Sequence, residues 1–217
     1  MNLNNHPDSS TLLAYAAGAV NEGFSLVIAA HLELCPDCRD EVTEAEALGG
    51  GLMQHLPAAE MSDAGMAQIW ERIEADPIPE KVHRRPAETW GLPAVLAPFV
   101  PGGLSGVRWR TLVPGIKQLR LENVESGQGS VRLLSISPGA TVPQHTHLGS
   151  ELTLVLQGSF RDEMGHYKQG DLADVDSSVQ HQPVVDSDQP CICLIATDQR
   201  LKFTSALNRM LQPLVGI

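Results

Sequence analysis

Apolar residues recur at helical spacing through the first third of the chain and predict four helices. The first covers HPDSSTLLAYAAGAVNEG, which residues 8–10 can cap and Gly18 can end. The second covers FSLVIAAHLELC and the third PDCRDEVTEAEALGGGL, with a stop predicted at the glycines 49–51. The fourth covers SDAGMAQIWERIEAD, and its apolar side chains fall on one face: Met66, Ile69, Trp70 and Ile73.

The pattern changes after residue 76. The segment PIPEKVHRRPAE, residues 77–88, holds three prolines and mixed charge without a helical period, so it is predicted to be a linker. The runs VRLLSIS, ELTLVLQGSF, DLADV and CICLIAT then predict short strands separated by turn sequences. We therefore expect a multidomain α + β chain: a small helical domain at 1–76, the linker, and an all-β barrel or sandwich at 89–217.

Composition and charge narrow the classes of function. With 217 residues and 42% apolar residues the chain can bury a core, whereas its 4% aromatic content is low for a protein that stacks bases. The net charge is −11, and residues 1–80 alone carry −12. An acidic surface repels phosphate and suits a basic protein partner, so direct nucleic-acid binding is not expected. A merely solubilising surface is the alternative.

Location follows from what the sequence lacks. No apolar run is long enough to span a bilayer, and MNLNNHPDSS has neither the basic start nor the apolar stretch of a signal peptide. We expect a cytoplasmic protein without a membrane partner. Thiols stay reduced there, so clustered cysteines more often bind metal than form disulfides.

The stretch HLELCPDCRD predicts a metal site. His31 and Cys35 lie one helical turn apart, and Cys35 and Cys38 have the short spacing that lets two thiolates reach one tetrahedral Zn²⁺. His6, in the polar segment before the first helix, is the expected fourth ligand. The alternative is a chance spacing on a helix surface. A thioredoxin-type redox pair is disfavoured because no βαβ pattern surrounds it.

A second group of candidate ligands lies in the predicted strands. His145 and His147 are two apart and face one side of a strand, and Glu151 begins the next strand on the same side. The strand that returns across the sheet brings His181. Three imidazoles and a carboxylate suit Zn, Mn, Fe, Ni or Cu. A histidine pair on a strand surface, with no metal, is the alternative.

The first group resembles the zinc-binding anti-sigma fold, whose signature H-x3-C-x2-C is present at His31, Cys35 and Cys38. Members of that family bind an extracytoplasmic-function sigma factor and cover the surfaces with which it contacts RNA polymerase. The resemblance implies the same partner here and makes the stripe of the fourth helix a candidate contact surface. Ordinary packing inside the helical domain is the alternative for that stripe.

The second group resembles the first cupin motif, G-x5-H-x-H-x3-E-x6-G, from Gly139 to Gly158. The second cupin motif is kept at Gly170 and His181, whereas turn positions that are usually proline, glycine and asparagine differ: Asp176, Ser178 and Val185. The resemblance implies a small β-barrel with a metal in its mouth over residues 90–200.

Both modules in this order resemble the ChrR family of anti-sigma factors. That resemblance implies a regulator rather than an enzyme, with Zn²⁺ in the N-terminal site and Zn²⁺, Mn, Fe or Ni in the cupin. It also implies that the cupin is needed for release of the sigma factor under singlet oxygen or related oxidants. The rival hypothesis is a cupin metal-dependent dioxygenase with a regulatory helical domain. No base or substrate-orienting group beyond the ligands supports it.

Overall fold

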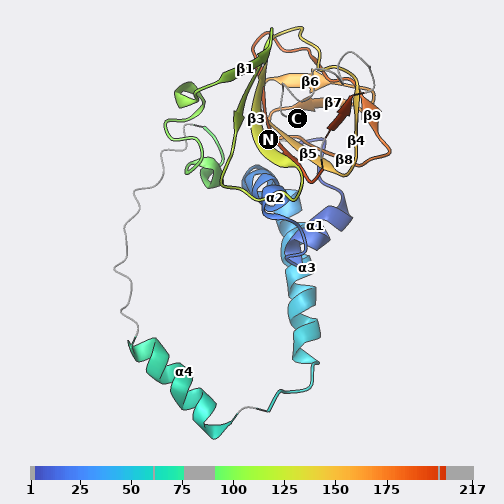
Figure 1. The fold of residues 1–217 in the computed structure, drawn as a ribbon. Helices are drawn as coiled ribbons and strands as arrows, with labels where there is room; N and C mark the ends of the chain where they lie inside the picture. The colour runs from blue at the N-terminus through green and yellow to red at the C-terminus, as the bar shows by residue number, and fades with distance from the viewer. Residues whose placement is uncertain (1–2, 61, 76–90, 200, 204–217) are drawn as a thin grey trace.

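The computed structural model describes residues 3–60, 62–75, 91–199 and 201–203 (Figure 1). The linker predicted at 77–88 lies outside these ranges. The helices are α1 (Ser9–Ala16), α2 (Glu22–Leu34), α3 (Pro36–Gln54) and α4 (Asp63–Ala75), followed by the 3-10 turns η1 (Ala94–Leu96) and η2 (Leu104–Gly106).

The four predicted helices are present, and their ends have local causes. The Asn21 side chain caps α2 by accepting a hydrogen bond from the backbone N–H of Phe24 at 2.9 Å. The stop predicted at 49–51 is wrong, because α3 continues through these glycines to Gln54. None of the three has a positive φ, so they do not form the left-handed cap that ends a helix. The helix ends just before Pro57, whose ring disfavours helical backbone in the preceding residue.

The rest of the described chain forms three antiparallel sheets that surround a common interior (Figure 1). The six-stranded sheet has the order β1 (Arg110–Val113), β2 (Ile116–Arg120), β3 (Ser130–Ile136), β11 (Cys191–Thr197), β5 (Glu151–Gln157) and β8 (Leu172–Val175). One three-stranded sheet has the order β10 (Val184–Val185), β6 (Ser159–Arg161) and β7 (His166–Lys168). The other has the order β12 (Leu201–Phe203), β4 (His145–His147) and β9 (Gln180–His181).

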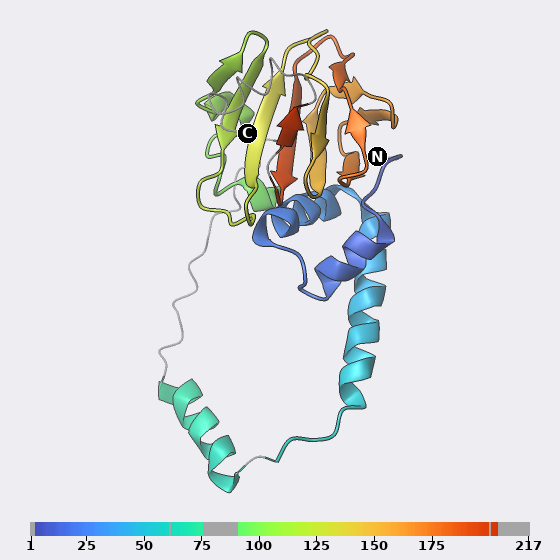
Figure 2. The same cartoon turned by 45° about the vertical axis from the view of Figure 1, so that its right-hand side comes forward.

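The central strands of the six-stranded sheet are buried on both faces. On β5, Leu152 and Leu154 point to the outer face and join the apolar side chains of α2, whereas Val155 belongs to the cluster inside the barrel. Strand β11 alternates in the same way, with Leu194 outside and Cys193 inside. Two-sided burial explains why these strands read as continuous apolar runs. Figure 2 shows α2, in blue, directly against this sheet.

Polar contacts fix α2 to the barrel at both of its ends. At the start, the N–H of Gly23 donates to the Glu125 carbonyl at 2.8 Å, and the Glu22 carboxylate accepts from the Glu125 N–H. At the end, the Glu33 carboxylate accepts from the backbone N–H groups that open η1, those of Ala94 and Val95. The helical region and the barrel therefore share one core and one set of hydrogen bonds.

Helix α4 differs from the other three helices. Both views show it away from α1–α3 and from the barrel (Figures 1 and 2). Its predicted stripe is exposed, at 51% for Met66, 47% for Ile69, 56% for Trp70 and 57% for Ile73, so these side chains do not pack into the core of the described residues. Within the described ranges, no helix is long and apolar enough to cross a membrane.

Candidate metal centres

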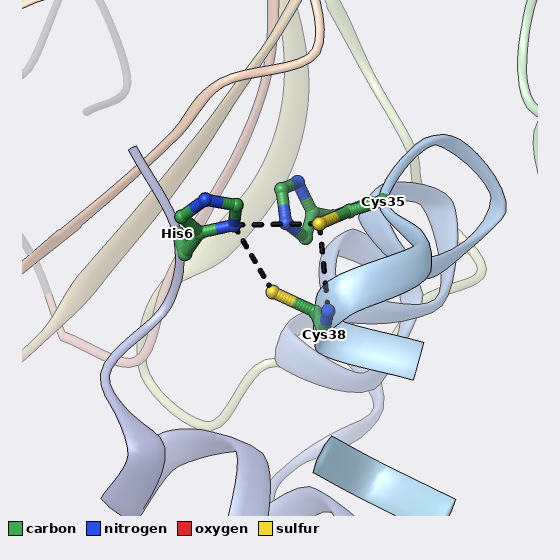
Figure 3. Close-up of side chains that lie close together, drawn as sticks. His6, Cys35 and Cys38 are labelled. Atoms are coloured by element: carbon green, nitrogen blue, oxygen red, sulfur yellow. Dashed lines mark hydrogen bonds between the residues drawn. The ribbon is translucent and has the colours of Figure 1, made fainter. Parts of the chain in front are cut away.

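The structure brings His6, His31, Cys35 and Cys38 together in a cluster that we call the clasp. Their ligand atoms all lie within 4.8 Å of one another. His6 Nδ1 is 3.2 Å from Cys38 Sγ and 3.3 Å from Cys35 Sγ, and Figure 3 shows the imidazole facing both sulfurs. The edges of a tetrahedral Zn²⁺ site with sulfur and nitrogen ligands are roughly 3.3–3.8 Å long. The clasp therefore has about the size that Zn²⁺ requires.

The local fold explains how four distant residues meet. His31 lies in the last turn of α2, and Cys35 follows one turn later, where α2 ends and α3 begins. The Cys35 sulfur accepts a hydrogen bond from the backbone N–H of Cys38 at 3.5 Å, so the start of α3 fixes the second thiol beside the first. His6 comes from the segment before α1, which runs along the barrel.

The environment of His31 fits a metal ligand. Its Nδ1 lies 3.0 Å from the carbonyl oxygen of Gly170, so the N–H is on this nitrogen and Nε2 carries the lone pair. His31 is fully buried, and its Nε2 has no hydrogen-bond partner within the described part of the chain. Burial lowers the pKa of His31 to about 4, although the hydrogen bond to Gly170 acts in the opposite direction. The imidazole is thus neutral and ready to coordinate.

The environment of Cys38 also favours metal over free-thiol chemistry. Burial, the hydrogen bond with Cys35 and the nearby carboxylates of Glu41 and Asp37 raise the pKa of the Cys38 thiol to about 12. Reactive redox cysteines have lowered pKa values and positive surroundings instead. A thiolate at this position needs a cation beside it, and a bound Zn²⁺ would supply that charge.

The second cluster, which we call the barrel site, contains His145, Glu151 and His181. All three side chains are buried, and their ligand atoms lie within 4.8 Å of one another. Strands β4 and β9 place His145 directly opposite His181, with the two Nε2 atoms 3.1 Å apart. Glu151 begins β5, where its carboxylate accepts a hydrogen bond from Thr153. The predicted ligand His147 ends β4, but its side chain lies outside what the structure describes.

The sequence analysis did not identify Asp162, which contacts His181 of the barrel site on the ring nitrogen that faces away from His145. Its Oδ2 lies 2.8 Å from Nδ1 of His181, and both side chains are almost fully buried. Burial raises the pKa of Asp162, but His181 and two backbone N–H groups lower it by more. Burial conversely opposes charge on His181, yet Asp162 and Glu151 raise its pKa overall. A carboxylate behind a histidine orients the ring toward a metal.

The remaining cysteines take no part in either cluster. Cys191 and Cys193 face the barrel interior with their sulfurs 3.6 Å apart, and both are buried in its apolar core. The hydrogen bond with Cys191, together with burial, raises the pKa of the Cys193 thiol. Their burial agrees with small apolar side chains of the core.

Comparisons with known proteins agree with this arrangement. The profile of the ChrR cupin-like domain matches residues 103–200. The anti-sigma-E factor ChrR of Cereibacter sphaeroides is 41% identical to this chain over 217 residues, all of both proteins.

One solved structure agrees with this match over nearly the whole chain. The structure of Rhodobacter sphaeroides SigE in complex with the anti-sigma ChrR matches with a TM-score of 0.75 and 38% identity, covering 91% of this chain and 100% of the other. An RmlC-like cupin protein from Ralstonia eutropha is more distant, with a TM-score of 0.43 and 17% identity over 50% of this chain and 72% of the other. On the full-length match to ChrR, this chain belongs to the ChrR family of anti-sigma factors.

Proposed function

We propose that this protein binds and inhibits an extracytoplasmic-function sigma factor, and that Zn²⁺ in the clasp maintains the geometry this binding requires. The full-length likeness to a protein that is solved in complex with a sigma factor is the observation that carries the proposal. The acidic charge of residues 1–80 supports it, because a partner that binds promoter DNA carries basic surface.

The exposed apolar side chains of α3 and α4 support a protein partner. Besides the α4 stripe, the second half of α3 and the residues after it expose large apolar side chains by 62–71%: Leu48, Leu52, Met53 and Leu56. Two amphipathic surfaces on helices joined by a short connection can enclose a partner between them. Several large apolar side chains exposed on the same elements usually mark an interaction site.

Zinc in the clasp would cross-link three parts of the chain. One ligand comes from the N-terminal segment, one from α2, and two from the start of α3. A structural metal adds its binding free energy to the stability of the fold that it cross-links. We infer that the metal fixes the direction in which α3 leaves the barrel, and with it the surface offered to the sigma factor.

The barrel site would carry a second metal and take part in release of the sigma factor under singlet oxygen or related oxidative stress. A buried set of two imidazoles and a carboxylate, with His147 as a further candidate, is suited to Zn²⁺, Mn, Fe or Ni. The dioxygenase alternative is not favoured, because the relative that matches over its full length is an anti-sigma factor.

The proposal is tested by capture of the extracytoplasmic-function sigma factors of the source genome on the immobilised chain. We expect one of them to bind and EDTA to abolish the binding. If EDTA removes ~3 kcal/mol of binding free energy, the affinity for the sigma factor falls more than hundredfold. We also expect Trp70→Ala to weaken capture, since it removes the largest side chain of the exposed α4 stripe.

The matched control is Met164→Ala, which truncates an equally exposed apolar side chain on the barrel and should leave capture unchanged. Exposing the captured complex to singlet oxygen tests the barrel site. The unaltered chain should release the sigma factor, and a His145→Ala plus His181→Ala chain should retain it. Capture that survives EDTA would rule out the zinc-dependent mode of binding, and capture unaffected by Trp70→Ala would exclude the α4 stripe from the contact surface.

A further inference from the structure

The N-terminal segment that carries His6 is bound to the barrel along its length. Leu3 packs against Gly170, where an added Cβ would lie only 2.6 Å from the leucine side chain. The Asn5 carbonyl accepts a hydrogen bond from the backbone N–H of Leu172 at 3.1 Å. Further along, the Asp174 carboxylate accepts hydrogen bonds from the Asp8 N–H at 3.1 Å and from the Thr11 hydroxyl at 2.7 Å. One ligand of the clasp is therefore placed by the barrel.

Asp171 is the centre of this attachment. It is fully buried, and both of its carboxylate oxygens accept hydrogen bonds. Oδ1 accepts from the backbone N–H groups of Asn4 and Asn5, at 3.0 and 3.4 Å. Oδ2 accepts from the Asn5 side-chain amide and from the Lys168 N–H, both at 3.1 Å. One carboxylate thus ties the segment just before His6 to the turn between β7 and β8.

The same turn orients a second ligand. The residue before Asp171 is Gly170, whose carbonyl accepts the hydrogen bond from His31 Nδ1. Two of the four clasp ligands, His6 and His31, are therefore positioned by adjacent residues of the barrel. Neither of these barrel residues is itself a ligand of the clasp.

Strand β8 connects this turn with the barrel site. It begins at Leu172, next to the clasp, and ends at Val175, which pairs with Glu151 across the sheet. The three residue steps from Leu172 to Val175 span roughly 10 Å, so the attachment of the clasp and the barrel site lie at opposite ends of one short strand.

We propose that Asp171 is a positioning residue of the zinc clasp. The inference rests on the metal proposed for the clasp.

The test is a titration of the full chain with Co²⁺, which produces a thiolate-to-metal charge-transfer band. Only the clasp contributes thiolates to a candidate metal cluster among the described residues, so the band reports the clasp and not the barrel site. Asp171→Asn places an amide NH2 against N–H donors, because both carboxylate oxygens are in use. We expect this variant to bind Co²⁺ at the clasp more weakly, by up to the ~10–100-fold that loss of a direct hydrogen-bond partner of a ligand causes.

Two matched variants sharpen the result. Asp174→Asn should have a much smaller effect, because both of its hydrogen bonds go to one oxygen that the amide can still supply. Asp176→Asn lies just beyond the far end of β8. Among the described residues its carboxylate accepts bonds only from the neighbouring Ser178, so this variant should leave the Co²⁺ affinity unchanged. Circular dichroism and the urea midpoint establish that each variant is folded.

The outcomes separate the two hypotheses. If the unaltered chain gives no charge-transfer band, the metal clasp itself is wrong. If the band is present and Asp171→Asn shifts the urea midpoint without weakening Co²⁺ binding, Asp171 is only structural and the inference is overturned. Equal weakening in all three variants would indicate an effect of net charge and would also overturn it.

Discussion

His31 owes its orientation to an acceptor 139 residues away in the chain, the carbonyl of Gly170. The spacing of His31, Cys35 and Cys38 was enough to predict the cluster, because helix geometry places such residues on one side. The acceptor could not be predicted, because a carbonyl has no residue type to recognise. The role of Asp162 beside His181 could not be predicted for a related reason, since an acidic residue in a polar turn is usually a solvent-exposed surface residue.

The buried neutral His31 makes the stability of the metal-free protein depend on pH. Its pKa is about 4 in the folded state and 6.5 when exposed, so between these values only the unfolded chain takes up the proton. The neutral His31 therefore stabilises the folded state fully above pH 6.5. As the pH falls from 6.5 toward 4, the free energy of unfolding decreases by about 3 kcal/mol in total.

Urea unfolding of EDTA-treated protein between pH ~7.5 and ~4 checks this expectation. The variant His31→Gln lacks the titrating ring and should show a shallower decline of the unfolding free energy over this range. His55→Gln, which replaces an exposed histidine at the end of α3, should behave like the unaltered chain. Parallel curves for His31→Gln and the unaltered chain would contradict the assignment.

The positions of the helices were predictable from sequence because the apolar periodicity is a local signal. The positions of the central strands were predictable because both of their faces are apolar, which gives continuous apolar runs. The glycines 49–51 show where local rules fail. Glycine ends a helix only if the chain turns there with a positive φ, and nothing in the triplet itself requires this turn. The site at which α2 meets the barrel was also beyond prediction, because it depends on the pairing of distant surfaces.

Gly23 at the start of α2 gives a test of that docking. Replacing glycine by alanine inside a helix normally stabilises it by ~0.5–1 kcal/mol. At Gly23 the new Cβ would lie 2.6 Å from both the Ser126 hydroxyl and a Val131 methyl group. The Ser126 hydroxyl already donates to the Thr197 carbonyl, so it cannot move freely. We expect Gly23→Ala to lower the free energy of unfolding by about 1–3 kcal/mol.

Gly49→Ala is the matched control on α3, since a methyl group added at this position would have no neighbour within 4 Å among the described residues. It should raise the free energy of unfolding by up to ~1 kcal/mol. Urea midpoints of both variants decide the question. A stabilising Gly23→Ala would mean that α2 does not pack against the barrel as closely as described.

At the scale of the whole molecule, the apolar core crosses the boundary expected between the domains. Sequence predicted a helical region and a barrel, because composition changes at residue 76, but composition does not reveal that α2 covers the sheet. A protease site inserted at 77–88 allows a direct test. After cleavage, the two fragments should elute together in gel filtration, held by the shared core and the Asp171 contacts.

Urea should separate the fragments, and dilution should restore the joint peak. Fragments that separate under native conditions would show that the contact between α2 and the barrel is too weak to hold them. Gly23→Ala should loosen the association, which links this measurement to the one on the element scale.

Among the described residues, helix α3 has buried side chains only near its start, at Cys38 and Val42. Cys38 lies in its first turn and its last residue is Gln54, so about 24 Å of helix extends beyond the clasp. A tilt of about 10° at the clasp would displace the far end by about 4 Å, more than half a helical turn. In the metal-bound form that we propose, a small change of geometry at the two clasp sulfurs would therefore displace the far end of α3 by enough to misalign a protein interface.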